Sequence, residues 1–115
     1  MTLRIGEIVL IRMRFHQFTG SKVRPAVVLL DTGDDDFVAA PVTSQSRLTN
    51  YDFAIDNWQA AGLNVPSTIR IHKLSVLAKA DIARTVGMLT ETDHTSFIRA
   101  LCNSFCPSRL GQTNA

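Results

Sequence analysis

The sequence predicts a mainly β protein of the α+β class, a small antiparallel barrel with one helix packed on it. Three observations support this prediction. About six short segments show the two-residue alternation or the β-branched, apolar composition of strands. Turn-forming residues separate these segments at short intervals. The periodicity of an amphipathic helix is clear in one place, near the C-terminus.

The N-terminal half contains three predicted strands. Residues 8–16 alternate between apolar and polar side chains, which is typical of a strand with one face in water. Residues 25–30 form a near-continuous apolar run typical of a central strand, and Pro25 can open it because a first residue need not donate to the ladder. A polar turn at 32–36 leads to a third strand at 37–42. The last two strands are expected to pair as a hairpin.

The following segment is predicted to hold shorter elements. Residues 51–56 alternate again, and residues 57–62 are expected to form one helical turn closed by Gly62. Residues 67–72 are rich in β-branched side chains and predict another strand. Short apolar pieces then continue around a turn at 79–81.

The helix is expected to begin at Thr90, which opens a capping box with Asp93 three residues later. Pro107 is expected to end it. Residues 1–107 are therefore predicted to form one domain, and 108–115 a frayed tail. The apolar stripe of the helix consists of Phe97, Ile98, Leu101, Cys102 and Phe105.

The composition restricts the class of protein. With 115 residues, 45% apolar and 19% charged, the chain matches a single globular domain. No apolar run is long enough to span a membrane, and the apolar N-terminal segment does not match a signal peptide, so a cytoplasmic protein is expected. Cys102 and Cys106 are expected to be half-buried thiols on one helix face rather than a disulfide or a metal site.

Charge is distributed unevenly along the chain. Residues 1–30 carry five basic residues against one acidic residue, and residues 61–90 carry four against one. Residues 31–60 carry six aspartates against one arginine. If the two basic segments meet in the fold, they form a positive face that attracts a polyanion. An ordinary mixed surface is the alternative.

The predicted hairpin brings a candidate site together. We expect Asp31 to face Phe37. The register then places Arg24 opposite Ser44, with Thr43 one step away. A guanidinium suits phosphate oxygens because its N–H groups form a planar fork. The rim of the hairpin is therefore either a phosphate-binding corner or the place where an arginine caps loop carbonyls.

Five stretches, taken in order and spacing, resemble one protein family. The stretches are GEIVL at 6–10, GSKVRPAVVL at 20–29, VAAPVTSQ at 38–45, PSTIRIHKL at 66–74, and residues 82–93 with Gly87 and Leu89. Together they are similar to the MazF/PemK-like toxins of type II toxin–antitoxin systems. The resemblance covers residues 6 to 105.

This resemblance implies an SH3-like antiparallel β-barrel with a C-terminal helix, assembled as a homodimer. It implies a metal-independent, cofactor-free endoribonuclease that cuts single-stranded RNA, usually messenger RNA, at short sequences. The products would be a 2′,3′-cyclic phosphate and a free 5′-hydroxyl. It also implies a cognate antitoxin whose disordered tail occupies the RNA groove, and contact with operator DNA only through the antitoxin complex.

The resemblance also assigns residues. The arginine of the Arg-Pro motif is Arg24 and the threonine of the Pro-x-Thr-Ser motif is Thr43, and these two are the family's catalytic pair. A fixed guanidinium stabilises negative charge that develops on phosphoryl oxygens, but it is a poor general base because it stays protonated. Candidate contacts to RNA are Lys22, Ser44, Gln45, Arg70 and Lys73.

Four other residues have less specific predictions. Imidazole suits acid–base chemistry near neutral pH, but His16 is expected to be an exposed loop residue. His72 has either a structural or an RNA-contacting role. Trp58 and Tyr51 are able to stack on a base, yet are expected in the core or at a dimer surface.

Two other functions remain open from the sequence. One is a toxin of the same fold that poisons a topoisomerase by binding it. The other is a nucleic-acid-binding barrel without activity. The loop at 16–23 lacks an acidic residue that some family members carry there, so no RNA sequence preference is predicted.

Overall fold

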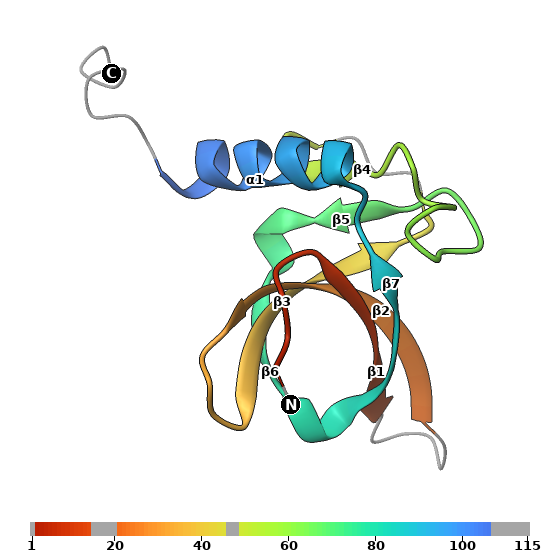
Figure 1. Cartoon of the computed structure of the whole chain (residues 1–115), viewed down its shortest axis with the longest axis vertical. Helices are drawn as coiled ribbons and strands as arrows, with labels where there is room; N and C mark the ends of the chain where they lie inside the picture. The colour runs from red at the N-terminus through yellow and green to blue at the C-terminus, as the bar shows by residue number, and fades with distance from the viewer. Residues whose placement is uncertain (1, 15–20, 46–48, 107–115) are drawn as a thin grey trace.

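The computed structural model describes residues 2–14, 21–45 and 49–106. It contains a curved seven-stranded sheet and a C-terminal α-helix, which confirms the predicted α+β class (Figure 1). Two short 3-10 turns precede and follow the sixth strand, η1 at Ile71–Lys73 and η2 at Lys79–Asp81. The strands and helix are β1 (Glu7–Arg14), β2 (Ser21–Asp31), β3 (Asp36–Thr43), β4 (Asp52–Ala54), β5 (Thr68–Arg70), β6 (Ser75–Ala78), β7 (Ile82–Met88) and α1 (Glu91–Phe105).

The strands curl into an incompletely closed barrel. Their order is β4-β5-β3-β2-β1-β7, with β6 also paired to β3, and the described ladders are antiparallel. Viewed as in Figure 1, β7, β1, β2, β3 and β6 form a ring. No ladder joins β6 to β7 within the described residues, and η2 connects them. An ion pair of 2.8 Å between Lys79 of η2 and Asp31 of β2 ties this junction to the hairpin.

The sheet separates two apolar cores, because side chains alternate between its faces. One core fills the inside of the ring and includes Val9, Val28 and Phe37. The other lies between the outer face of the sheet and α1, and it includes Val27 of β2 and Phe97 of α1. The helix therefore covers one side of the sheet and leaves the end of the barrel open (Figure 1).

A β-bulge changes the predicted register of the β2–β3 hairpin. The hairpin starts as expected, with Asp31 opposite Phe37. Between Val28 and Leu30 the register shifts by one residue. Without that shift, Val28 of the inner core would face Ala40 of the outer core, and the two apolar faces would not match.

The bulge corrects the expected position of Arg24. Past the bulge, Ala26 pairs with Pro41. Continued to the ends of the strands, this register places Arg24 level with Thr43, and the expectation that it faces Ser44 is wrong. The one-residue difference arises because matching the two cores takes precedence over an unbroken ladder.

The start of α1 is confirmed and anchored to a distant turn. Thr90 is the N-cap, and its hydroxyl accepts a hydrogen bond of 3.3 Å from the backbone N–H of Asp93. The Asp93 side chain is 2% exposed. Its carboxylate accepts backbone N–H bonds from Asp56 at 3.3 Å and Asn57 at 2.7 Å. A buried carboxylate thus joins the helix to the turn that follows β4.

The second half of α1 extends past the sheet (Figure 1). Phe97 is fully buried, whereas Phe105 is 50% exposed. Cys102 and Cys106 are exposed, so the expectation of half-buried thiols is wrong. The stripe predicted from the sequence is real, but only its first part meets the sheet. Pro107 and the predicted tail at 108–115 lie outside the described residues, so the domain boundary stays a prediction.

Gly87 allows close contact between β7 and the turn at 57–62. That turn is confirmed by a hydrogen bond of 3.1 Å from the Ala61 N–H to the Asn57 carbonyl and by a φ of +99° at Gly62. A Cβ atom at Gly87 would lie 2.0 Å from the Ala61 carbonyl oxygen. A side chain there would force two backbone segments apart.

We therefore expect Gly87→Ala to destabilise the fold by about 3 kcal/mol or more, because backbone atoms cannot yield as a side chain would. Gly33→Ala is the matched control: no atom lies within 4 Å of its Cβ position, and only its φ of +84° opposes the substitution, at a cost of about 1 kcal/mol. Urea denaturation of both variants measures the difference. Equal losses of unfolding free energy in Gly87→Ala and Gly33→Ala would contradict the steric explanation.

The Asp31 junction predicts a pH-dependent contribution to stability. The Lys79 ammonium, together with backbone N–H groups of Leu3 and Gly33, holds the pKa of the Asp31 carboxyl well below its usual range. A depressed pKa stabilises the folded state fully above the unfolded pKa of roughly 3.9, and this is lost as the pH falls. Asp31→Asn should therefore lower the melting temperature at pH 7, with a difference from wild type that shrinks below about pH 4. A difference that stays constant down to pH 2 would argue against the junction.

Candidate active site

The candidate site lies where the β2–β3 hairpin opens at the end of the barrel. Arg24 follows the parity of Ala26 and Val28, and Thr43 follows that of Ala39. Both residues therefore belong to the face that lines the inside of the barrel, beyond the last buried apolar layer. The alternation of the two strands brings the guanidinium and the hydroxyl to one edge.

Arg24 and Thr43 together line two adjoining pockets. The first pocket extends toward the outer side, where Ser44, Gln45 and Arg84 contribute. The second pocket lies on the barrel side and is lined further by Met13, Ser75, Arg70 and Lys73. The pair thus forms the ridge between two pockets. A chain-like ligand that crosses this ridge would enter both.

Arg24 presents an exposed guanidinium. Across residues 2–14, 21–45 and 49–106, no hydrogen bond or ion pair engages it, so the alternative that it caps loop carbonyls is not observed there. A guanidinium without a protein partner is able to give its planar set of donors to an anion.

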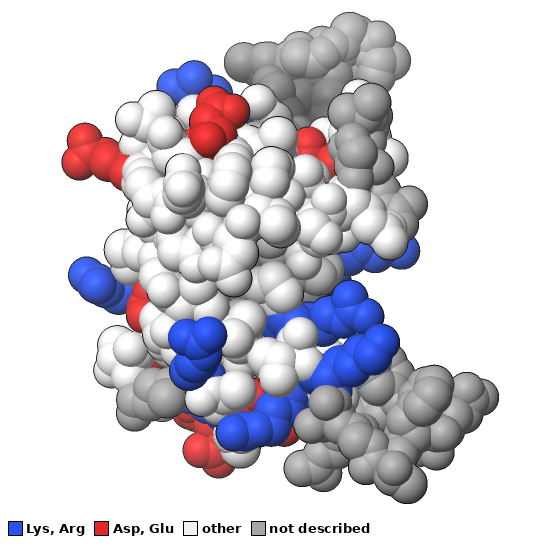
Figure 2. Space-filling model, turned by 90° about the vertical axis from the view of Figure 1, so that its right-hand side faces the viewer, with Lys and Arg blue, Asp and Glu red and all other residues white. Residues whose placement is uncertain are grey.

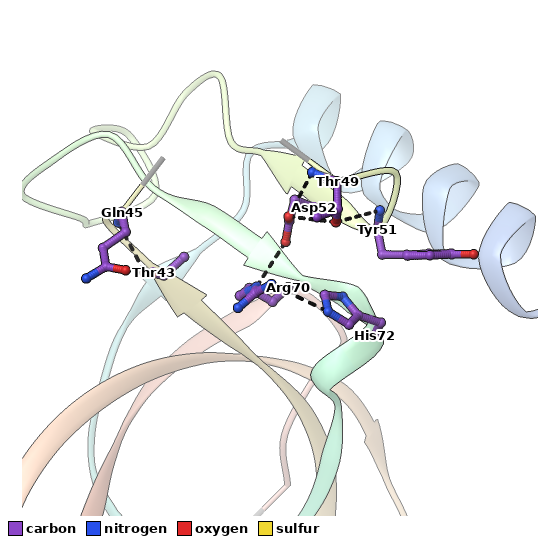
Figure 3. Close-up of polar contacts among 7 residues, drawn as sticks. All are labelled: Thr43, Gln45, Thr49, Tyr51, Asp52, Arg70 and His72. Atoms are coloured by element: carbon purple, nitrogen blue, oxygen red, sulfur yellow. Dashed lines mark hydrogen bonds and ion pairs between the residues drawn. The ribbon is translucent and has the colours of Figure 1, made fainter. Parts of the chain in front are cut away.

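Thr43 has a fixed orientation. Its hydroxyl oxygen accepts a hydrogen bond of 3.1 Å from the backbone N–H of Gln45, a turn motif common for threonine (Figure 3). A hydroxyl that accepts one bond still has its hydrogen to donate. Thr43 is half-buried, and in the β3–β5 ladder it is paired with Thr68 of β5. The strand and the turn together hold the hydroxyl at the ridge.

Arg70, which lines the second pocket, forms a hydrogen-bonded ion-pair network with Asp52 and Thr49 (Figure 3). The Nε of Arg70 donates to Oδ1 of Asp52 at 3.1 Å, with 20% of the Arg70 side chain and 1% of the Asp52 side chain exposed. Oδ2 of Asp52 accepts bonds from the hydroxyl of Thr49 at 2.7 Å and from its N–H at 3.1 Å. Burial acts to raise the pKa of Asp52, but the bonds from Thr49 and Arg70 outweigh it, and the pKa is lowered. The carboxylate is therefore ionised at neutral pH.

The two basic segments of the sequence meet in the fold. Arg84 of β7 pairs with Leu10 of β1, and it shares the first pocket with Arg24. Figure 2 shows Lys and Arg side chains gathered on the lower half of one face. The acidic turn at 34–36 lies at the other end of the β2–β3 hairpin. A positive face is therefore present, in place of the mixed surface that the sequence left open.

The other predicted residues are less closely grouped. Lys22 is exposed on β2, on the parity of Arg24, and is not among the residues that line either described pocket. His72 is exposed, its Nε2 lies 3.5 Å from Nη2 of Arg70, and its ring centroid is 5.7 Å from that of Tyr51. Trp58 packs on the outer core as expected, whereas Tyr51 is 46% exposed and is not a core residue. His16 lies outside the described residues.

Sequence reasoning missed Asp52, Thr49 and Arg84. The strand at 51–56 was expected, but its partner was not, and the pairing of Asp52 with Arg70 depends on a ladder between two three-residue strands. No group of three His, Cys, Asp or Glu side chains in the described part of the chain is arranged to hold a metal ion. Among the helices described, none is long and apolar enough to cross a membrane.

Comparison with known proteins identifies the architecture. No curated protein matches the chain. MazF-mt6 from Mycobacterium tuberculosis is similar in structure, with 21% identity, coverage of 84% of this chain and 95% of that one, and a TM-score of 0.66. An endoribonuclease in complex with its cognate antitoxin from Mycobacterial species is 14% identical, with coverage of 93% of this chain and 98% of that one, and a TM-score of 0.72. A chain of the MazE-MazF crystal structure from Deinococcus radiodurans is 14% identical, with coverage of 94% of this chain and 99% of that one, and a TM-score of 0.75.

At these identities the similar structures establish the fold. The family is established by the sequence itself, because the model for the PemK-like, MazF-like toxin of type II toxin-antitoxin systems matches residues 4–105. That range contains β1 to β7, both residues of the ridge and all of α1. The chain therefore belongs to the PemK-like, MazF-like toxin family.

Proposed function

We propose that this chain is the toxin of a toxin–antitoxin pair and a metal-independent endoribonuclease. It cleaves single-stranded RNA, messenger RNA above all, at short sequences in the cytoplasm and so inhibits growth. The observation that carries the proposal is the guanidinium of Arg24, which lacks a partner in the described residues and shares two basic pockets with the Thr43 hydroxyl. Family membership supplies the reaction class.

The reaction begins when a ribose 2′-hydroxyl oxygen attacks the adjacent phosphorus. The new P–O bond closes a 2′,3′-cyclic phosphate while the bond to the 5′-oxygen breaks. The 2′-hydroxyl loses its proton, and the leaving oxygen gains one to become a free 5′-hydroxyl. Negative charge builds on the phosphoryl oxygens in the transition state, where donors that are already in place are most effective.

Arg24 stabilises this charge, since its guanidinium stays protonated and offers two donors to one phosphoryl group. Thr43 donates its hydroxyl hydrogen to the phosphate or orients the attacking 2′-hydroxyl. The Gln45 N–H holds the threonine oxygen in place for either role. Neither residue is required to act as the base.

The bound RNA follows the basic pockets on both sides of the ridge. Arg70 and Lys73 line the barrel-side pocket, while Ser44 and Gln45 line the outer one. Lys22 adds positive charge on the same strand as Arg24. The five residues contribute mainly contacts to phosphate and sugar, which set the register of the RNA.

We also propose a cognate antitoxin and a homodimer for this chain. One similar structure is of an endoribonuclease in complex with its cognate antitoxin, and another is of MazE-MazF. An antitoxin with an acidic, disordered segment would suit the basic pockets. Operator DNA would be bound only through that complex.

The first test is Arg24→Ala in a cleavage assay that contains EDTA. Because the side chain is exposed, the fold should persist, while the cleavage rate falls by at least about 10²- to 10³-fold. Arg99→Ala, on an exposed position of α1, is the matched control and should cut normally.

Each alternative gives a different result in this assay. Cleavage that persists in Arg24→Ala, or that needs added magnesium, would refute the proposal. Salt-dependent binding with unchanged RNA ends would favour a nucleic-acid-binding barrel without activity. Inhibition of supercoiling without RNA cleavage would favour a topoisomerase poison.

The second test separates the hydroxyl of Thr43 from its shape. Thr43→Val keeps the branched side chain but removes the donor, and should slow single-turnover cleavage by about 10- to 100-fold, the range for a hydrogen bond to a charged group. Thr43→Ser keeps the donor and should retain most of the rate. Detection of the 2′,3′-cyclic phosphate end measures both. A valine variant as active as the serine variant would remove Thr43 from the mechanism.

A further inference from the structure

Asp52 is a buried negative charge that lies behind Arg70, one of the basic residues that line the barrel-side pocket. Its side chain is 1% exposed, and its partner Arg70 lines the barrel-side pocket with Arg24, Thr43 and Lys73. On electrostatic grounds alone, a carboxylate here weakens the binding of a polyanion. Its presence therefore requires a different role.

The contacts of Asp52 point to that role. Thr49 fixes Oδ2 with two hydrogen bonds, of 2.7 and 3.1 Å. Oδ1 accepts the bond from the Nε of Arg70 at 3.1 Å. The carboxylate therefore holds the guanidinium through its inner nitrogen. Among the described contacts, neither terminal nitrogen of Arg70 forms a hydrogen bond with the carboxylate.

Those terminal nitrogens are available to a ligand. Within the described chain, the one contact of Arg70 besides that with Asp52 is from Nη2 to Nε2 of His72, at the long distance of 3.5 Å. The Arg70 side chain is 20% exposed, and the residue lines the barrel-side pocket. In Figure 3 the Arg70 guanidinium lies between Thr43 and His72. Thr43, Thr68 and Arg70 also share one face of the β3–β5 ladder.

The ion pair is not needed merely to join its strands. Backbone ladders already pair β4 with β5 at three positions, and the Ile71 N–H donates to the Tyr51 carbonyl at 2.9 Å. These backbone bonds leave the side chain of Arg70 able to take other rotamers, which its bond to the buried Asp52 carboxylate prevents. A fixed guanidinium, by contrast, loses less conformational freedom when it binds a phosphate.

We propose that Asp52 is a positioning residue that holds Arg70 to bind a second phosphate of the RNA, next to the phosphate at Arg24. The inference rests on the proposed function for the identity of the ligand. Thr49 supports the carboxylate, and Arg70 touches the substrate. The barrel-side pocket thereby fixes the path of the RNA on one side of the ridge.

The test uses binding, so that it does not depend on cleavage. The probe is a single-stranded, 2′-O-methylated RNA oligonucleotide of random sequence, which lacks the attacking hydroxyl. Dissociation constants are measured at several salt concentrations for wild type, Asp52→Asn, Arg70→Gln and the double variant. Asp35→Asn, an exposed aspartate in the distant hairpin turn, controls for the loss of one negative charge.

We expect Asp52→Asn and Arg70→Gln each to weaken binding by about five- to tenfold, and the double variant no further, since coupled residues are not additive. The slope of log K against log salt should fall by about 0.7 in each, the value for one lost phosphate contact on a single strand. Asp35→Asn should leave affinity unchanged or slightly raise it, because it removes only negative charge.

Several results would overturn the proposal. Tighter or unchanged binding by Asp52→Asn would mean that the carboxylate acts only as a charge. If Asp52→Asn weakened RNA binding by the same factor when Arg70 is already replaced by Gln, the Asp52 carboxylate would act on the fold. Wild-type protein that does not bind the probe would exclude the second phosphate site, whereas binding without cleavage of natural RNA would refute the proposed function alone.

A milder variant covers the case in which Asp52→Asn does not fold. Thr49→Val, at an exposed residue, removes the 2.7 Å bond to Asp52 and the 3.2 Å bond that the hydroxyl accepts from the Tyr51 N–H, and it keeps the backbone bond to Asp52. We expect binding to weaken about two- to threefold when Arg70 is present, and no change when it is Gln. The same loss in both backgrounds would contradict positioning.

Discussion

The register between β2 and β3 determines what the open end of the barrel contains. Two apolar cores lie on opposite faces of the sheet, so each strand must keep its inner and outer residues in phase with its neighbour. The bulge between Val28 and Leu30 restores that phase after the tight turn. As a consequence, Arg24 ends level with Thr43. The packing of the cores, far from the chemistry, thus sets the geometry of the ridge.

The two ends of the hairpin have opposite electrostatic character. Near the turn, the Asp31 carboxylate accepts bonds from two backbone N–H groups and pairs with the ammonium of Lys79, which lies between β6 and β7. At the other end, basic side chains from three strands meet around two pockets. The acidic group at the turn thus stabilises the barrel, whereas the basic groups at the other end line pockets that a ligand could enter. This distribution of charge would attract a polyanion to one end of the hairpin.

Local pattern predicted the elements of this fold but not the details that depend on distant partners. The hairpin, the single turn closed by Gly62 and the helix starting at Thr90 each follow from nearby residues. The bulge was missed because it satisfies two cores at once, which no short window reveals. The exposure of Cys102 was missed because the stripe shows where a helix is apolar, not how far the sheet beneath it reaches. The approach of Asp52 to Arg70 needed a ladder between strands 18 residues apart.

The two arginines at the barrel-side pocket differ in how they are held, and the difference suits different tasks. Arg70 is fixed at its Nε by a buried carboxylate, so little conformational entropy remains to be lost when a phosphate binds. Such a group contributes affinity in the ground state. Arg24 is exposed and lacks a partner in the described residues, so under the proposed function the RNA would order it. A lysine could not replace Arg70, because an ammonium has no inner nitrogen to give to Asp52 while its outer donors face the ligand. In the proposed reaction, affinity supplied by Arg70 would let the contact at Arg24 strengthen as charge develops, which is the condition for a contact that accelerates a reaction.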